Sequence, residues 1–183
     1  MKDLSNEQII ESTRCWVSSV VVDLNLCPFA RRTLVKELIQ FKVTNAGTEE
    51  ALLMALQDEL TFLFGNSDVE TTLLIHPGVL QDFMDYNQFL DLADQLLVSM
   101  SLEGIFQIAS FHPDYQFGGT QQEDPENYSN RSPYPMLHIL REASVSAALE
   151  SYPDPENIPE DNISRLNQLG TTHMQSLLAS CQK

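Results

Sequence analysis

Apolar residues recur every three or four positions over residues 5–24, a spacing that is typical of an amphipathic helix. Ser5 and Gln8 have the spacing of a capping box at its start. Pro28 breaks this pattern, and residues 34–43 then combine alternation with β-branched and aromatic side chains. The first part of the chain is therefore predicted to form a helix followed by a strand.

Two later β-rich runs, VETTLLIHPG and IFQIASFHPD, end in the same way, because His76 and His112 are each followed by proline. Residues 79–100 lie between the runs and have helical spacing. A strand, a helix and a strand in this order predict a right-handed βαβ crossover with parallel strands. Parallel strands would place both histidines at one edge of the sheet, where α/β proteins bind their ligands.

Helical spacing appears in three more segments. Residues 48–65 begin with a capping threonine, and residues 133–151 follow Ser132, a candidate cap. A proline-rich acidic connection, residues 151–162, then leads to residues 163–180, which are expected to form a C-terminal docking helix.

Residues 114–132 show no periodicity, and a loop of about 19 residues is long enough to be functional. Its aromatic side chains favour an Ω-like loop that packs on the protein. The predicted fold is α/β or α+β, with residues 1–183 in one domain. A small sheet with the βαβ crossover would be covered by about five helices.

Composition and charge narrow the classes of function. The chain has 183 residues, 43% of them hydrophobic and 20% charged, as in globular proteins. Its net charge of −16 disfavours nucleic acid and anionic membrane as partners. No apolar run is long enough to span a membrane, and no leader pattern opens the sequence, so a cytoplasmic location is expected.

The three cysteines are widely spaced, and none forms a CxxC pair. Reduced thiols are therefore expected at Cys15, Cys27 and Cys181. Cys27 could have a lowered pKa and act as a nucleophile, because arginines follow it and a short helix could begin there. The alternative is a small buried hydrophobe.

Arginines are scarce in the middle of the chain, since no lysine or arginine occurs between Val43 and Asn130. Arg131 and Arg141 could together hold the carboxylate or phosphate of an anionic ligand. Hydrogen bonds from uncharged side chains would complete this substrate site, at Asn127, Asn130 and Tyr115. The alternative is that the two arginines only pair with the many carboxylates of the chain.

His138, Arg141 and Glu142 would share one face of the predicted helix over residues 133–151. With His112, they suggest a site in which the two histidines transfer protons and Glu142 orients a neighbour. His112, His138 and Glu142 could instead hold a divalent metal, although two ligands at this spacing are weak evidence. A plain solvated helix face is the simplest alternative. No GxSxG, GxGxxG or P-loop motif is present, which argues against serine α/β-hydrolases, Rossmann oxidoreductases and P-loop kinases. The sequence contains no nucleotide-binding motif and leaves the cofactor open.

The segments LNLCPFA, IHPG, FHPDYQFGGT and NYSNRSPYPMLHILREASV together resemble the bacterial family catalogued as domain of unknown function 1415. The resemblance extends from the first helix to about Leu149. It implies no activity, substrate or cofactor, but its motifs contain the candidate residues selected above.

The leading hypothesis is a small enzyme that acts on an anionic small molecule through a His/Arg/Glu site beneath the loop of residues 114–132. One alternative is a metal-dependent, hydrolase-type site. Another is a non-catalytic small-molecule-binding or interaction protein. The apolar C-terminal helix could form a homodimer contact.

Overall fold

The helices and the sheet follow the class predicted from the sequence. The computed structural model describes residues 4–182, and in this part of the chain seven α-helices surround a four-stranded mixed sheet. In chain order the elements are α1 (Asn6–Trp16), the π-helix η1 (Val17–Val22), α2 (Ala30–Val35), β1 (Ile39–Val43), α3 (Glu49–Gly65), β2 (Thr71–Ile75), α4 (Phe83–Ser99), β3 (Phe106–Phe111), the 3-10 helix η2 (Pro125–Ser129), β4 (Met136–Arg141), α5 (Glu142–Ser151), the 3-10 helix η3 (Pro155–Asn157), α6 (Ile158–Leu169) and α7 (Thr171–Ser180).

The sheet has the strand order β1-β2-β4-β3. β1 and β2 are parallel, while β4 is antiparallel to both of its neighbours. β2 and β3 therefore run in the same direction on either side of β4. As predicted, His76 and His112 follow these two strands at one edge of the sheet.

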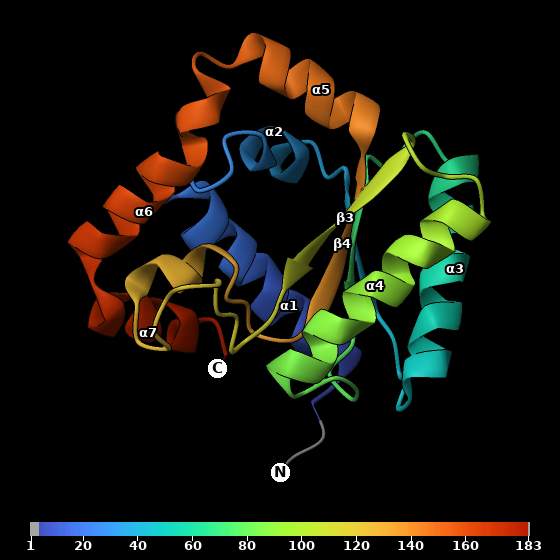
Figure 1. The fold of residues 1–183 in the computed structure, drawn as a ribbon, viewed down its shortest axis with the longest axis horizontal. Coiled ribbons are helices and arrows are strands. Elements are labelled where there is room, and N and C mark those ends of the chain that lie inside the picture. Colours follow the sequence, from blue (N-terminus) through green and yellow to red (C-terminus); the bar gives the residue numbers. More distant parts are fainter. Residues whose placement is uncertain (1–3, 183) are drawn as a thin grey trace.

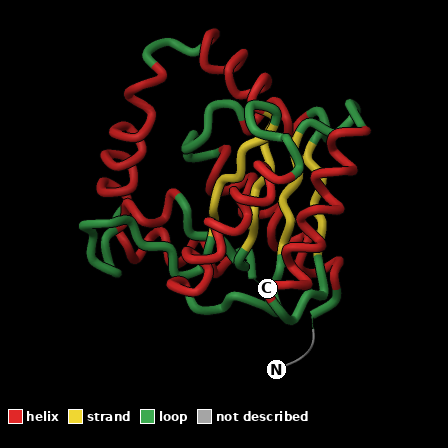
Figure 2. The backbone as a smooth tube through the Cα atoms, turned by 45° about the vertical axis from the view of Figure 1, so that its right-hand side comes forward, coloured by secondary structure: helices red, strands yellow, loops and turns green. Residues whose placement is uncertain are grey.

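Helices cover both faces of the sheet (Figure 1). α3 and α4 pack on one face, and α1 with η1 packs on the other. Alternation along β2 supplies both cores, because Leu74 belongs to the first face and Leu73 to the second. Figure 2 shows that α5 and α6 form an arch that leaves the body of the molecule and returns to it.

The prediction of a helix over residues 133–151 is wrong in its first half, because residues 136–141 form the strand β4. Alternation decides this assignment: Leu137 and Ile139 enter the α3/α4 core, whereas Met136 enters the other. β2 and β3 also pair with the strand along both sides. Nor does Ser132 cap a helix, since its hydroxyl donates to the carbonyl of Tyr134 at 2.7 Å.

Three other boundaries differ from the predictions. α2 occupies the start of the strand predicted over residues 34–43, which begins only at Ile39. α6 begins inside the predicted connection over residues 151–162. Gly170 then separates α6 from α7 with a φ of +77°, so two helices replace the single C-terminal helix. These short additional helices account for a total above the expected five.

Cys15 and Cys181 form a disulfide that joins α1 to the turn after α7, contrary to the expected reduced thiols. Their spacing of 166 residues carried no sequence signal of a pair. The remaining cysteine, Cys27, is free. None of the helices within residues 4–182 is both long and apolar enough to cross a membrane.

Candidate functional site

The loop of residues 114–132 is tied down by one of the predicted ligand-binding arginines. Arg131 is only 8% exposed. Its guanidinium donates to the carbonyl of Tyr115 at 3.0 Å and to that of Gln122 at 2.6 Å, and it lies over the Tyr128 ring. Arg131 therefore uses its donors to hold the loop together.

The two asparagines predicted to bind substrate also have partners within the protein. The Asn127 side-chain carbonyl accepts from the Phe117 backbone at 3.0 Å and from the Thr120 hydroxyl at 2.8 Å. The Asn130 amide donates to the carbonyl of Ser110 at 3.0 Å. These hydrogen bonds connect parts of the loop to one another and attach the loop to β3.

Tyr115 anchors the loop through its ring. The ring lies 5.0 Å from that of Phe83 and 4.9 Å from that of Phe117, between centroids. Its hydroxyl accepts from Ser110 at 3.4 Å. The loop is thus an ordered cover, as its aromatic content predicted.

His112 is fully buried on the α3/α4 side of the sheet. Its Nδ1 accepts from the backbone N–H of Asp114 at 3.0 Å, so the ring hydrogen lies on Nε2 and is donated to the carbonyl of Leu80 at 3.2 Å. Burial lowers the pKa of His112, against the smaller raising effect of its bond to Leu80. Both ring nitrogens are therefore used by the backbone.

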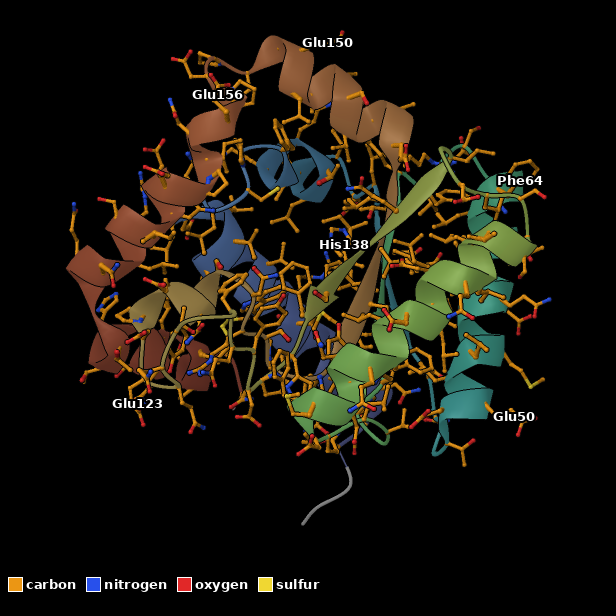
Figure 3. All side chains as sticks on the ribbon, viewed as in Figure 1. Glu50, Phe64, Glu123, His138, Glu150 and Glu156 are labelled. Atoms are coloured by element: carbon orange, nitrogen blue, oxygen red, sulfur yellow. A yellow bond between two sulfur atoms is a disulfide. The ribbon has the colours of Figure 1, made fainter. Side chains whose placement is uncertain are left out.

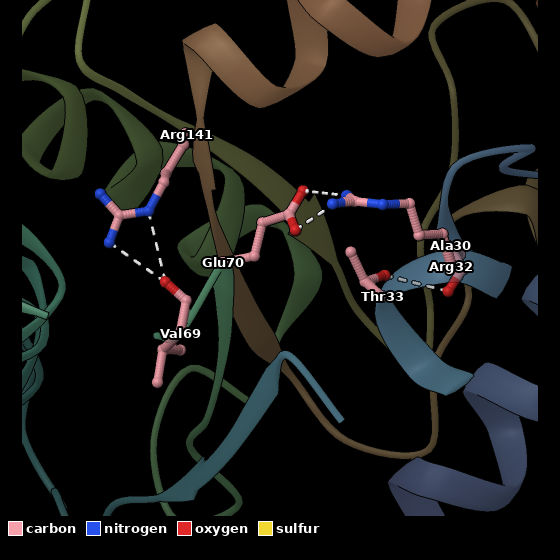
Figure 4. Close-up of polar contacts among 6 residues, drawn as sticks. All are labelled: Ala30, Arg32, Thr33, Val69, Glu70 and Arg141. Atoms are coloured by element: carbon pink, nitrogen blue, oxygen red, sulfur yellow. Dashed lines mark hydrogen bonds and ion pairs between the residues drawn. The ribbon is translucent and has the colours of Figure 1, made fainter. Parts of the chain in front are cut away.

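Arg141 also binds carbonyls. Its guanidinium donates to Leu63 at 2.6 Å, to Asn66 at 2.8 Å and to Val69 at 3.1 Å. Figure 4 shows it pointing toward Val69. Arg131 precedes β4 and Arg141 ends it, and a six-residue strand spans roughly 17 Å, so the structure does not bring the two arginines together as a clamp.

The three candidate metal ligands do not converge either. His138 projects from β4 on the face opposite to that of His112, and Glu142 begins α5 beyond the far end of the strand. The predicted cluster depended on helical spacing between His138 and Glu142, and the strand removes that spacing. Within residues 4–182 no group of three His, Cys, Asp or Glu side chains could hold a metal ion.

The structure instead contains a cavity of about 1040 Å³ on the α1 side of the sheet. Its walls come from β2, β3 and β4, from α1 with η1, from α2 and from α5. It lies toward the end of the sheet opposite to His76 and His112, where β4 ends and its neighbours begin. The polar and aromatic side chains of its lining include Trp16, Cys27, Arg32, Glu70, Thr71 and His138.

His138 forms part of the cavity wall from the centre of β4, in the interior of the molecule (Figure 3). Its Nε2 lies 2.7 Å from the Thr71 hydroxyl, and that hydroxyl lies 2.6 Å from the carbonyl of Ile139. Burial lowers the pKa of His138 to about 4, so the imidazole is neutral at pH 7.

Two charged side chains meet at the cavity wall. Arg32 binds both carboxylate oxygens of Glu70 at 2.9 Å, as Figure 4 shows. The Arg32 side chain is 59% exposed, so it is accessible to a ligand at the mouth of the cavity. Within residues 4–182, Glu70 is the one carboxylate of the lining. Arg141 borders the cavity, but its guanidinium lies on the α3/α4 side of the sheet, over the Phe106 ring.

Cys27 lines the same cavity from the turn before α2. Burial raises the pKa of its thiol, and this effect exceeds the lowering by the backbone N–H groups of Phe29 and Ala30. The shift is opposite to the lowered pKa predicted from the neighbouring arginines. At pH 7 Cys27 is therefore a thiol.

The remaining walls are mainly apolar. Trp16 meets Phe111 edge to face at 5.1 Å between ring centroids. Val17 and Val21 of the π-helix η1 line the wall beside them, and π-helical turns are often found at functional sites. Such walls suit a ligand with a large apolar part.

Of the residues predicted from the sequence, His138, Cys27 and Arg141 share this cavity, while the loop residues and His112 do not line it. Arg32, Glu70 and Thr71 were missed. Arg32 stood in the basic segment next to Cys27, which was its only signal. Glu70 is 38 residues away from Arg32 in sequence, so their pairing left no pattern to detect.

Comparison with known proteins gives a family and nothing more specific. No curated protein and no solved structure is detectably similar to this chain. Residues 8–176 match a family described as protein of unknown function (DUF1415). This match includes every residue of the cavity and nearly the whole chain, so the protein belongs to the DUF1415 family.

Proposed function

We propose that this protein binds an anionic small molecule with a large apolar part in the cavity between the sheet, α2 and α5. An accessible guanidinium beside apolar walls carries the proposal. The chain has a net charge of −16, yet the Arg32 side chain is 59% exposed at a mainly apolar cavity whose one carboxylate among the described residues, Glu70, is already bound to it. Such a guanidinium can form charge-assisted hydrogen bonds with an anion in a chain whose overall charge repels anions.

Arg32 is the group best placed to meet that anion. Its partner Glu70 leaves part of the guanidinium accessible, and an exposed ion pair contributes at most about 1 kcal/mol. A carboxylate, sulfonate or phosphate on the ligand can therefore share or replace this contact. Arg141 does not share this role, because backbone carbonyls on the α3/α4 side of the sheet hold its guanidinium.

The protonation states favour binding over proton-transfer catalysis. His138 is neutral, with its pKa lowered to about 4, and the Cys27 thiol has a raised pKa. A general base works best with a pKa near the working pH. Both groups therefore serve better as neutral polar contacts in a pocket than as a base and a nucleophile.

A pair of dyes tests the proposal. 8-Anilinonaphthalene-1-sulfonate is an apolar anion whose fluorescence rises in apolar sites, and N-phenyl-1-naphthylamine has the same rings without the sulfonate. We expect both dyes to bind, the sulfonate roughly tenfold more tightly because of a charge-assisted contact with arginine. Fluorescence titration measures both affinities.

Two substitutions locate the bound dye. Ala109→Phe fills the cavity from β3 and should abolish binding, while Leu92→Phe on exposed α4 should leave it unchanged. If Ala109→Phe binds as well as the wild type, the dye is elsewhere and the cavity is not the site. Equal affinities for the two dyes would remove the anion from the proposal.

A charge substitution tests the role of Arg32. Arg32→Gln should lower the affinity for the sulfonate dye and leave that for the neutral dye unchanged. Lys36→Gln is the matched control, because Lys36 is exposed on the same short segment and does not line the cavity. An equal loss in both variants would indicate general electrostatic attraction instead of a contact.

A further inference from the structure

The hydrogen positions around His138 follow from two short contacts. The Thr71 hydroxyl lies 2.6 Å from the carbonyl oxygen of Ile139, which has no hydrogen to give. The single hydroxyl hydrogen of Thr71 therefore lies in that contact. The 2.7 Å contact between Thr71 and His138 then requires a hydrogen on Nε2 of the imidazole.

This assignment leaves Nδ1 of His138 as a bare acceptor. The neutral ring carries one hydrogen, and Nε2 holds it. Nδ1 has no hydrogen-bond partner among residues 4–182 and is not fully enclosed by protein atoms. Because the ring forms part of the cavity wall, this lone pair is available to a donor group of a ligand that displaces water from the cavity.

We infer that the ligand is an acid that also carries a hydrogen-bond donor, a hydroxyl or N–H group, which Nδ1 of His138 accepts. This inference rests on the function proposed above and adds the chemical class of the ligand. A carbonyl or ether oxygen at the same place would be repelled, because its lone pair would face that of Nδ1 with no hydrogen between them. His138 is thus a specificity-determining residue, and Thr71 is the residue that positions it.

Residues at the start of β2 link the anion-binding part of the site to His138. Glu70 and Thr71 are consecutive, and they hold Arg32 and His138 respectively. The cation for the acid group and the acceptor for the donor group are therefore fixed to neighbouring residues. Both groups line the same cavity.

Two probes that differ by one hydroxyl test the inference, namely 2-naphthoate and 6-hydroxy-2-naphthoate. Binding of 2-naphthoate reports on the proposed function, and the ratio of the two affinities reports on His138. We expect the hydroxylated probe to bind about fivefold more tightly by calorimetry, as one added hydrogen bond would give. His138→Phe should bring the ratio to about one, whereas His173→Phe on exposed α7 should preserve it.

Substitution of Thr71 provides a test that leaves the imidazole in place. Thr71→Val removes the hydroxyl that fixes the ring and should reduce the ratio, while Thr71→Ser restores the hydroxyl and the ratio. Nitrogen NMR of the histidines should show the His138 hydrogen on Nε2 in the wild type and in Thr71→Ser.

Four results would overturn the inference. They are equal affinities for the two naphthoates, a preference that survives His138→Phe, a ring hydrogen on Nδ1, and a protein that binds 2-naphthoate but excludes the hydroxylated probe. A wild-type protein that binds neither naphthoate would overturn both this inference and the proposed function.

Discussion

The two faces of the sheet are built from the same strands but differ in how completely they are filled. On the α3/α4 face, four leucines of α3 and the large rings of α4 have almost no exposed surface. On the other face, α1 and η1 cover only part of the sheet, and the cavity occupies the rest. One face is therefore closely packed, and the other contains a large cavity.

The helix over the cavity explains why that space stays open. α5 has no buried residue. Apart from Val145, the residues of α5 that line the cavity are small: Ala143, Ser144, Ala147, Ala148 and Ser151. Such side chains leave the volume between helix and sheet unoccupied, whereas a leucine at these positions would fill it.

Leu74 and Leu73 offer the most direct comparison of the faces, because they are neighbours on β2 that point in opposite directions. Leu74→Ala should reduce the free energy of unfolding by about 3 to 5 kcal/mol, since it opens a new cavity in a packed core. Leu73→Ala only enlarges an existing cavity and should cost about 2 kcal/mol. Urea denaturation measures both, and equal losses would contradict the difference between the faces.

Acid should destabilise the packed face through His76. Burial lowers the pKa of this histidine from 6.5 to about 4. The unfolded chain therefore binds a proton that the folded chain excludes, and the stability present above pH 6.5 is lost as the pH falls toward 4. The loss from this residue is about 3 kcal/mol.

His76→Asn keeps a donor for the carbonyl of Val79 and removes the titrating group. The variant should lose less stability than the wild type between pH 7 and pH 4.5, while His173→Asn should behave like the wild type. Identical pH dependence in wild type and His76→Asn would show that His76 is not the residue responsible.

Substitution of Arg131 tests whether this residue stabilises the loop or binds the anion. Arg131→Leu should reduce the free energy of unfolding by about 2 kcal/mol, because two carbonyls of the loop lose their charged donor. Its affinity for the sulfonate dye should stay that of the wild type. The opposite result, normal stability with lost anion binding, would restore the arginine clamp predicted from the sequence.

The smallest effect on stability is expected at the mouth of the cavity. Arg32→Gln should change the free energy of unfolding by less than about 1 kcal/mol, since the pair with Glu70 is partly exposed. Arg32→Gln is thus expected to lose dye affinity and keep its stability, whereas Arg131→Leu is expected to lose stability and keep its dye affinity. A loss as large as that of Arg131→Leu would assign Arg32 a structural role instead.

The sequence predicted the α3/α4 side of the molecule well. Helices over residues 48–65 and 79–100, and the two strands that end in His76 and His112, are where the pattern indicated. The apolar residues of these segments have clear spacing, because each helix is buried on a single face and the strand β2 is buried throughout. Their ends also carry clear signals.

The cavity side was harder to predict, for two physical reasons. MLHILR satisfies helical spacing as well as strand alternation, and a real helix follows it directly, so local pattern alone could not identify β4. The partners of Arg131 and Arg141 are backbone carbonyls, which every residue carries, so nothing in the sequence marked them. His138, a candidate site residue from the sequence, lines the cavity, but it does so from β4 and not from the predicted helix.

The disulfide between Cys15 and Cys181 turns nearly the whole chain into a closed ring. A ring closed between residues 166 positions apart has fewer unfolded arrangements than an open chain, a difference of about 5 kcal/mol in the chain-entropy description. That amount is comparable to the entire stability of many single domains. Cys15 also precedes Trp16, which lines the cavity, so the bond that limits the unfolded chain is next to one wall of the cavity. Thiol reductants that cleave the bond would shift the folding equilibrium toward the unfolded chain.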